Sequence, residues 1–356
     1  MAGIIYRFPT NVSMTEVTQE YVVEREKLLG LQIAPFEPHM TQRVQWDELD
    51  SERGMTAPHN MESDPKIDRR PGSKLREYEA IPFKQTDVIT EKELLRARQF
   101  GTLGGVVDLH DIVGRTMKAR VDKTYLRAEW CIWQALMGEL EIEENNVYVH
   151  EFFPVQVYNV VVDWDEFGTA TPLRDFNAVK LLFRGTGASG KEATAYMNST
   201  TINWLLENTN ASDIQGFKGE NFANLQFSLE DLNKILKKRG LPQIEEYDGG
   251  YIDEAGDYQT FIPDGEVVVI GKRPAAQKVM TFAMTPSLHL EKNGQPVPGF
   301  FSILEVNGHG NPGVLEVSSA ELGAGKNPRL EITGGVYGGP RMPYPRSIVR
   351  MRVKLT

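Results

Sequence analysis

Residues 106–137 read VVDLHDIVGRTMKARVDKTYLRAEWCIWQALM, and this stretch carries the strongest helical pattern of the chain. Its apolar and aromatic side chains recur at steps of three or four residues, which is the period of one helix face. They are Val106, Leu109, Val113, Met117, Val121, Tyr125, Ala128, Ile132 and Leu136. Glycines lie immediately before and after the stretch, at Gly105 and Gly138. The pattern predicts a helix of roughly 48 Å over residues 106–137, long enough to span a domain as a strut.

The sequence after this helix turns to residues that favour strands. Residues 146–162 are rich in Val, Tyr and Phe, and they predict a long hairpin or a twisted sheet. The mixed segment that follows predicts, in order, a strand, two helices and a strand, over residues 179–183, 194–207, 228–239 and 266–270. The remaining residues, 271–356, are rich in glycine and proline and again favour strands.

The part of the chain before the long helix divides into two segments. Residues 1–40 have the character of an arm, whereas both charge signs alternate closely from Arg43 to Glu79 and apolar residues are sparse there. Such a charged segment cannot offset the entropy cost of ordering with a core of its own. It is either a mobile linker or a projection that orders against another chain, and we predict an extended hairpin across a neighbouring subunit. The candidate assembly contacts in it are Glu52, Arg69, Arg70, Lys74 and Arg76.

The composition of the whole chain describes a folded protein and limits its function. Of its 356 residues, 40% are hydrophobic, which is enough to bury a sizeable core. The formal net charge of -10 argues against a dedicated nucleic-acid binder, because such proteins use Lys and Arg to neutralise phosphates. The charge either serves ordinary solubility or keeps the lumen of a DNA container from holding DNA tightly. No apolar run reaches the length of a secretory signal or of a membrane span.

The sequence offers few groups for catalysis or for metal binding. Its one cysteine, Cys131, cannot form a disulfide within the chain, and its place in the predicted helix between Trp130 and Ile132 favours a buried core residue. The six histidines include no pair at the three- or four-residue spacing of a helical metal site. We therefore expect no catalytic, cofactor-binding or metal-binding residue, and no enzyme activity.

One segment nevertheless resembles a nucleotide-binding motif. Residues 185–191 read GTGASGK, which satisfies the first seven positions of the phosphate-binding P-loop, and they lie between the predicted strand 179–183 and the predicted helix 194–207. The eighth position should carry a hydroxyl that binds magnesium, but Glu192 stands there. Asp163, the candidate for the second magnesium ligand, precedes the loop, whereas in most such enzymes it follows. We therefore favour a glycine-rich surface turn that ends in a solvated lysine.

The order of these segments resembles the lambda-like major capsid protein E family, whose members share the Hong Kong 97-type phage shell fold. Local sequence adds to the resemblance. RPG at 70–72, YEAIPF at 78–83 and TDVIT at 86–90 are similar to the return of the family's extended loop toward its long helix. LPQI at 241–244, YID at 251–253 and FIPDG at 261–265 are similar to the hairpin of its axial lobe. Residues 185–191 and the glycine-rich region 288–330 depart from the family's pattern.

The resemblance implies an α+β fold of the Hong Kong 97 type with five segments. These are an N-terminal arm over 1–40, an extended loop over 41–85, a peripheral domain with a spine helix over 86–172, an axial domain over 173–270, and return strands of the peripheral domain over 271–356. It also implies a structural protein that self-assembles into hexamers and pentamers of an icosahedral phage head enclosing double-stranded DNA.

The partners that the resemblance implies are other copies of the chain, a scaffolding protein, a portal and a decoration protein. Packaged DNA would be enclosed without sequence-specific binding, no membrane would be involved, and the virion would be assembled in the host cytoplasm. Two alternatives stay open at this point. One is the shell of an encapsulin-like nanocompartment, which shares the architecture, and the other is a P-loop NTPase that uses Gly185 to Lys191.

Overall fold

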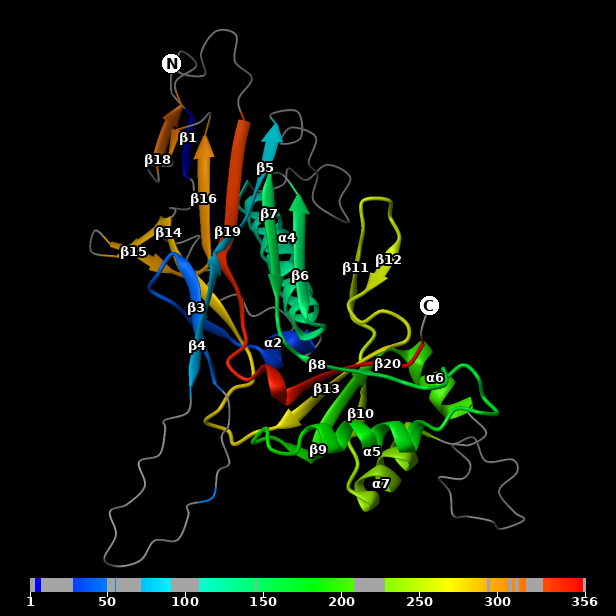
Figure 1. The fold of residues 1–356 in the computed structure, drawn as a ribbon. Coiled ribbons are helices and arrows are strands. Elements are labelled where there is room, and N and C mark those ends of the chain that lie inside the picture. Colours follow the sequence, from blue (N-terminus) through cyan, green and yellow to red (C-terminus); the bar gives the residue numbers. More distant parts are fainter. Residues whose placement is uncertain are drawn as a thin grey trace, which may run out of the picture.

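The computed structural model describes residues 4–7, 28–49, 55, 72–90, 109–144, 146–207, 228–292, 295–306, 309–310, 314–317 and 329–354. A long helix, two larger sheets with separate hydrophobic cores and several two-stranded sheets make up this part of the chain (Figure 1). Among these residues, no helix is both long and apolar enough to cross a membrane.

The long helix, α4, extends over Leu109–Leu136, so residues 106–108 of the predicted helix lie outside the described residues. The predicted apolar stripe is confirmed, because its members from Val113 onward are all buried: Val113, Met117, Val121, Tyr125, Ala128, Ile132 and Leu136. Gly138 follows the helix with a φ of +103°, a conformation that residues with a side chain rarely adopt. The chain reverses there, and strand β6 runs back beside α4 with β7 paired antiparallel to it (Figure 1).

The first sheet has seven strands and packs against α4. Strand β19 pairs with β5 over the whole length of β5. It also pairs with β14 and with β16. Phe36 of β2 meets the rings of Tyr125, Phe282 and Phe300 edge-on, with centroids 5.1 to 5.5 Å apart. The strands are β2 (Phe36–Pro38), β5 (Ile81–Thr90), β14 (Thr281–Lys292), β15 (Gln295–Pro298), β16 (Phe301–Val306), β17 (His309–Gly310) and β19 (Arg329–Arg341).

The second sheet has five strands in the order β10-β9-β13-β20-β8, and helices α5 and α7 lie below it in Figure 1. Its core includes Trp164, Phe176 and Phe183. The strands are β8 (Gln156–Asn159), β9 (Ser189–Met197), β10 (Gln243–Glu246), β13 (Glu266–Lys272) and β20 (Ile348–Arg352). The helices are α5 (Pro172–Leu182), α6 (Ser199–Glu207) and α7 (Leu229–Arg239).

Smaller elements complete the described chain. A short helix, α2, extends over Leu29–Ile33 near the C-terminal half of α4, and a turn of 3-10 helix covers Pro345–Ser347. Four antiparallel pairs make up the two-stranded sheets: β1 (Ile4–Arg7) with β18 (Val314–Val317), β3 (Arg43–Leu49) with β4 (Ser73–Glu79), β6 (Glu139–Glu144) with β7 (Val147–Phe152), and β11 (Gly250–Ile252) with β12 (Tyr258–Thr260).

Two sequence predictions around residue 190 are wrong. The predicted strand at 179–183 is the end of helix α5, because Phe176, Val179 and Phe183 recur at a helical spacing and are buried together, and Pro172 begins the helix. The predicted helix at 194–207 begins only at residue 199. Ala193, Ala195 and Met197 alternate as buried residues of strand β9 before it.

Candidate functional site

The base of the charged segment is an antiparallel hairpin, β3–β4, which pairs Arg43 with Glu79 at one end and Leu49 with Ser73 at the other. Its inner face belongs to the core of the subunit. Trp46 is buried and its ring stacks on that of Phe153, with 5.9 Å between centroids and 15° between planes. The hydroxyl of Tyr78 donates a hydrogen bond to the carbonyl of Pro340 at 2.7 Å. The predicted hairpin is confirmed at its base, where Trp46 and Tyr78 pack into the core of the same subunit. Its position across a neighbouring subunit stays a prediction.

The outer face of β3–β4 is exposed and mixes charged with apolar residues. The side chains of Leu49 and Leu75 are 43% and 66% exposed. Near them, Arg43 Nη1 lies 2.5 Å from Glu77 Oε1, and Gln45 donates a hydrogen bond to the same carboxylate at 2.8 Å. An exposed surface with apolar residues beside charges is typical of a protein contact.

The candidate assembly contacts have different positions relative to this hairpin. Glu52, Arg69 and Arg70 lie outside the described residues. Lys74 is exposed near the start of β4, opposite Glu48 in the strand pairing. Arg76 is partly buried, and its Nε donates a hydrogen bond to Glu48 Oε2 at 3.1 Å. Lys74 is therefore open to contact with another chain, whereas Arg76 already binds a carboxylate within its own chain.

A buried carboxylate, Glu129 of α4, joins three separate segments of the chain. It accepts hydrogen bonds from the backbone N–H groups of Gly30 and Leu31 at 2.6 and 2.8 Å, from Trp133 Nε1 at 2.8 Å, and from the hydroxyl of Tyr247 at 2.7 Å. Burial raises the pKa of Glu129 by more than these four hydrogen bonds lower it, so the pKa lies above its usual value. The carboxylate holds α2 and Tyr247, the residue that follows β10, against the long helix.

The approach of this carboxylate to the backbone explains the glycine at position 30. A Cβ atom on Gly30 would lie 2.8 Å from Glu129 Oε1, closer than real Cβ atoms approach any atom. Sequence reasoning missed Glu129. The sequence did contain a signal for it: Glu129 lies one helical turn before Trp133, among positions of the predicted helix that are buried.

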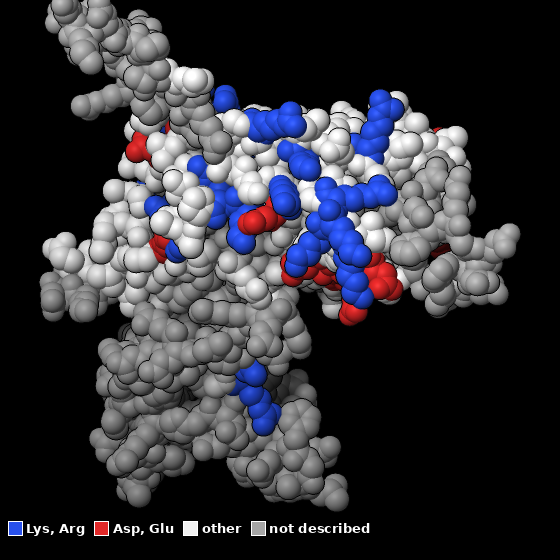
Figure 2. Space-filling view, turned by 90° about the horizontal axis from the view of Figure 1, so that it is seen from below, with Lys and Arg blue, Asp and Glu red and all other residues white. Residues whose placement is uncertain are grey.

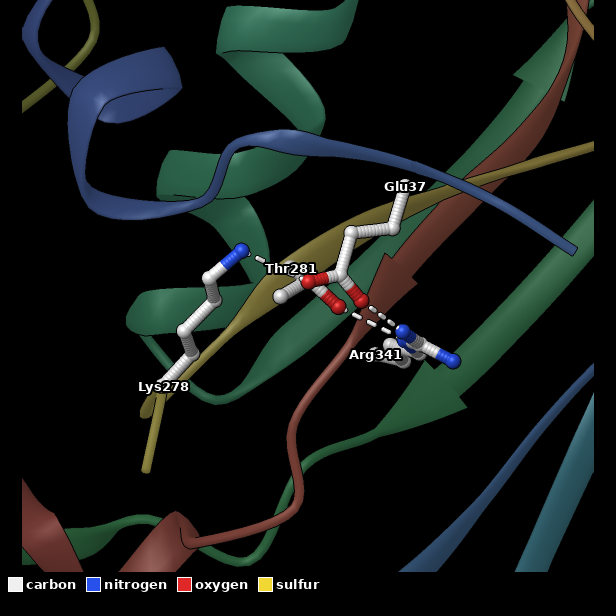
Figure 3. A network of polar contacts seen from close by, with 4 residues as sticks. All are labelled: Glu37, Lys278, Thr281 and Arg341. Atoms are coloured by element: carbon white, nitrogen blue, oxygen red, sulfur yellow. Dashed lines mark hydrogen bonds and ion pairs between the residues drawn. The ribbon is translucent and has the colours of Figure 1, made fainter. Parts of the chain in front are cut away.

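A second polar network fixes the strand β2 to the first sheet (Figure 3). Glu37 of β2 accepts a hydrogen bond from Lys278 Nζ at 2.7 Å and pairs with the guanidinium of Arg341, whose Nε also donates to Thr281 Oγ1 at 2.6 Å. Burial raises the pKa of Glu37, but the hydrogen bond from Lys278 and the charge of Arg341 outweigh it, and the pKa lies below its usual value. This network was also missed, because its members are far apart in the sequence.

The glycine-rich segment 185–191 does not have the surroundings of a P-loop. It connects helix α5 to strand β9, whereas a P-loop connects a strand to a helix whose first N–H groups bind the phosphates. The carbonyl of Thr186 accepts a hydrogen bond from Arg273 at 2.8 Å, and Glu192 pairs with Lys272 at 3.3 Å. The predicted surface turn fits this arrangement, and the context required for the nucleotide-binding alternative is absent.

Lys191→Ala is expected to leave assembly and stability nearly unchanged, and neither ATP nor GTP is expected to bind the wild-type chain at millimolar concentration. The reason is that the segment leads from helix α5 into strand β9 instead of into a helix, and that Glu192 replaces the magnesium-binding hydroxyl. Thermal unfolding of both proteins with and without nucleotide and magnesium checks this prediction. A rise in the melting temperature of the wild-type chain on adding nucleotide would contradict it.

Cys131 is expected to react with thiol reagents only as the protein unfolds. Its side chain is completely buried in α4, and this burial raises the pKa of the thiol to about 12, so that almost no thiolate is present at neutral pH. The labelling rate of the native protein should be compared with that of the protein in denaturant. Rapid labelling of the native protein would mean that this face of α4 is open to solvent.

Two solved structures are similar to the chain over nearly its whole length. A phage-related protein from Bordetella bronchiseptica RB50 has a TM-score of 0.54 and 11% identity, with 99% of this chain and 98% of that chain covered. A protein assigned to the capsid of a prophage of E. coli CFT073 has a TM-score of 0.57 and 11% identity, with 99% and 100% covered. These similarities confirm the predicted fold class, an α+β fold of the Hong Kong 97 type.

The sequence itself matches no protein of curated function. It does match the sequence pattern of one protein family, over residues 10–336. That family is described as phage major capsid protein E. Because the match spans most of the chain and the fold agrees with it, this chain belongs to the phage major capsid protein E family.

Proposed function

We propose that this chain assembles into hexamers and pentamers, which close an icosahedral phage head around double-stranded DNA. The family match over residues 10–336 is the observation that carries the proposal. The family also establishes the coarser statements: the chain is a structural protein of the virion capsid, assembles with copies of itself and is not an enzyme. A closed shell needs the same few contacts to repeat around every subunit, and the exposed outer face of β3–β4 is suited to one of them.

We assign the two hydrophobic cores to the two domains of a shell subunit. The core around α4 and the seven-stranded sheet would be the peripheral domain, centred on residues 86–172 and 271–356, to which β2 and the hairpin β3–β4 add side chains. The core of the five-stranded sheet would be the axial domain, centred on residues 173–270. That sheet also takes β8 and β20 from the flanking segments, so the chain crosses between the domains on strands that pair within the axial sheet. Residues 1–40 and 41–85 would be the arm and the extended loop.

We further propose a scaffolding protein, a portal and a decoration protein as partners, with assembly in the host cytoplasm before the DNA is packaged. The family match favours a phage head over an encapsulin-like compartment. The position of residues 185–191 between a helix and a strand argues against the NTPase alternative.

Electron microscopy of the purified, overexpressed chain tests the proposal directly. We expect shells, sheets or capsomers of uniform size, because an isolated subunit leaves the outer face of β3–β4 uncovered. A chain that stays monomeric at high concentration, alone and together with its scaffolding protein, would contradict the proposal. Sedimentation of the same sample separates true assembly from irregular aggregation.

A further inference from the structure

A cluster of basic side chains lies where helices α5 and α7 end beside the turn 185–191. A Cβ atom on Gly240, the C-cap of α7, would lie 3.2 Å from Lys191 Cγ, and a Cβ atom on Gly190 would lie 2.8 Å from the carbonyl oxygen of Lys180. The start of β9 therefore runs between the last turn of α5 and the end of α7. We call the resulting cluster the basic patch: Lys180, Arg184, Lys191, Lys237, Lys238 and Arg239.

The basic patch is open to solvent. All of its side chains are exposed except that of Lys180, which is partly buried. Figure 2 views the lower side of Figure 1, where α5 and α7 lie, and shows Lys and Arg side chains gathered across it with fewer Asp and Glu side chains among them. Within the described part of the chain, no carboxylate forms an ion pair with Lys180, Arg184, Lys191, Lys237 or Lys238. Glu192, the acidic residue nearest in sequence to Lys191, pairs with Lys272.

Helix stability explains only part of this arrangement. Basic residues in the last turn of a helix interact favourably with its dipole, and this accounts for Lys237, Lys238 and Arg239 in α7 and for Lys180 in α5. It does not account for Lys191, which lies at the start of a strand and places its side chain against the end of α7. Like charges that lie close together repel each other. An anionic partner would therefore relieve the electrostatic repulsion among the basic side chains of the subunit.

The character of the basic patch favours a nucleic acid over an acidic protein. Protein interfaces have an apolar centre, but among the described residues of α5, α7 and the turn the one large apolar side chain that is strongly exposed is Leu181, at 40%. Phosphate backbones are held through several separate Lys and Arg contacts that need no apolar centre and no defined pocket. The net charge of -10 means that DNA is repelled by the rest of the chain. A local basic patch would therefore also determine which side of the subunit faces the DNA.

We propose that the basic patch binds the phosphates of nucleic acid without sequence preference. Resting on the proposed function, this would place the side of the axial domain that carries α5 and α7 toward the DNA inside the shell. The turn 185–191, which resembles a phosphate-binding motif but lacks its surroundings, would then contribute Lys191 to a phosphate site of a different kind.

Binding of a short fluorescent DNA duplex by the full chain, measured by anisotropy over a range of salt concentrations, tests the proposal. The test variant is Lys237→Glu with Lys238→Glu. Its control is Lys84→Glu with Lys123→Glu, which exchanges two exposed lysines of β5 and α4 and changes the net charge equally. We expect the slope of log K against log salt to decrease by about 1 for each lysine that contacts a phosphate, in the test variant alone.

Three results would overturn the inference. They are the absence of binding by the wild-type chain at low salt, an equal loss in the control variant, and equally strong binding of polyglutamate, which would indicate an acidic protein partner. Circular dichroism confirms that both variants are folded. Shell formation is scored separately by electron microscopy, so normal shells without DNA binding would remove this inference and leave the proposed function intact.

Discussion

Glu129→Ala is expected to lose about 3 to 5 kcal/mol of unfolding free energy, the largest effect of any single substitution considered for this chain. The carboxylate is fully buried and accepts four hydrogen bonds. Its removal leaves the N–H groups of Gly30, Leu31 and Trp133 and the hydroxyl of Tyr247 without an acceptor, next to a new cavity. Urea unfolding followed by circular dichroism measures the loss.

Two further variants distinguish the effect of losing these hydrogen bonds from the effect of removing any carboxylate. Glu141→Ala removes an exposed carboxylate of β6 and should change stability by less than about 0.5 kcal/mol. Glu129→Gln should fall between the two, because the amide oxygen still accepts hydrogen bonds while the amide nitrogen faces other donors. If Glu129→Ala unfolded like Glu141→Ala, the carboxylate would not hold the three segments together.

Replacing Arg69, Arg70, Lys74 and Arg76 together by Glu is expected to give a soluble chain that forms no shells. A single exposed ion pair contributes only about 0 to 1 kcal/mol, so no one of these substitutions should decide assembly. A shell repeats each contact at every subunit, and the reversal changes four charges of the proposed hairpin contact at once. Sedimentation and electron microscopy of the variant measure assembly, and circular dichroism measures its helix content.

The position of Arg76 requires an additional control. Its Nε binds Glu48 within the chain at 3.1 Å, so Arg76→Glu would place two carboxylates together and could weaken the hairpin itself. The triple variant of Arg69, Arg70 and Lys74 leaves that pair intact and is expected to block assembly nearly as well. Shells of normal size from the quadruple variant would contradict the proposed contact, whereas a loss of helix content would show that the charges act within the subunit.

Elements with a strong local pattern could be predicted from the sequence. The stripe of α4 recurs every three or four residues over its whole length, and helix α7 is bounded by an N-cap at Ser228 and a left-handed glycine at Gly240. Such signals come from the residues of one segment. The long helix, the buried position of Cys131 and the hairpin at the base of the charged segment were therefore predictable.

Short apolar runs were a different case. Residues 179–183 fit a strand as well as a helix when considered alone, and their packing against β9 within the second core decides in favour of α5. That assignment also decides how the turn 185–191 is interpreted. Its sequence fits a P-loop, but because α5 is a helix the turn connects a helix to a strand.

The sequence by itself determined the long helix with its buried face, the charged hairpin and a resemblance to one capsid family, because periodicity and local composition are properties of single segments. Only the tertiary structure decided the partners of Glu129 and Glu37 and the gathering of the basic patch. Glu129 binds residues 98, 99 and 118 positions away, and Glu37 binds Arg341 at a separation of 304. Contacts over such separations depend on how the sheets and helices pack, and no local pattern in the chain records that packing.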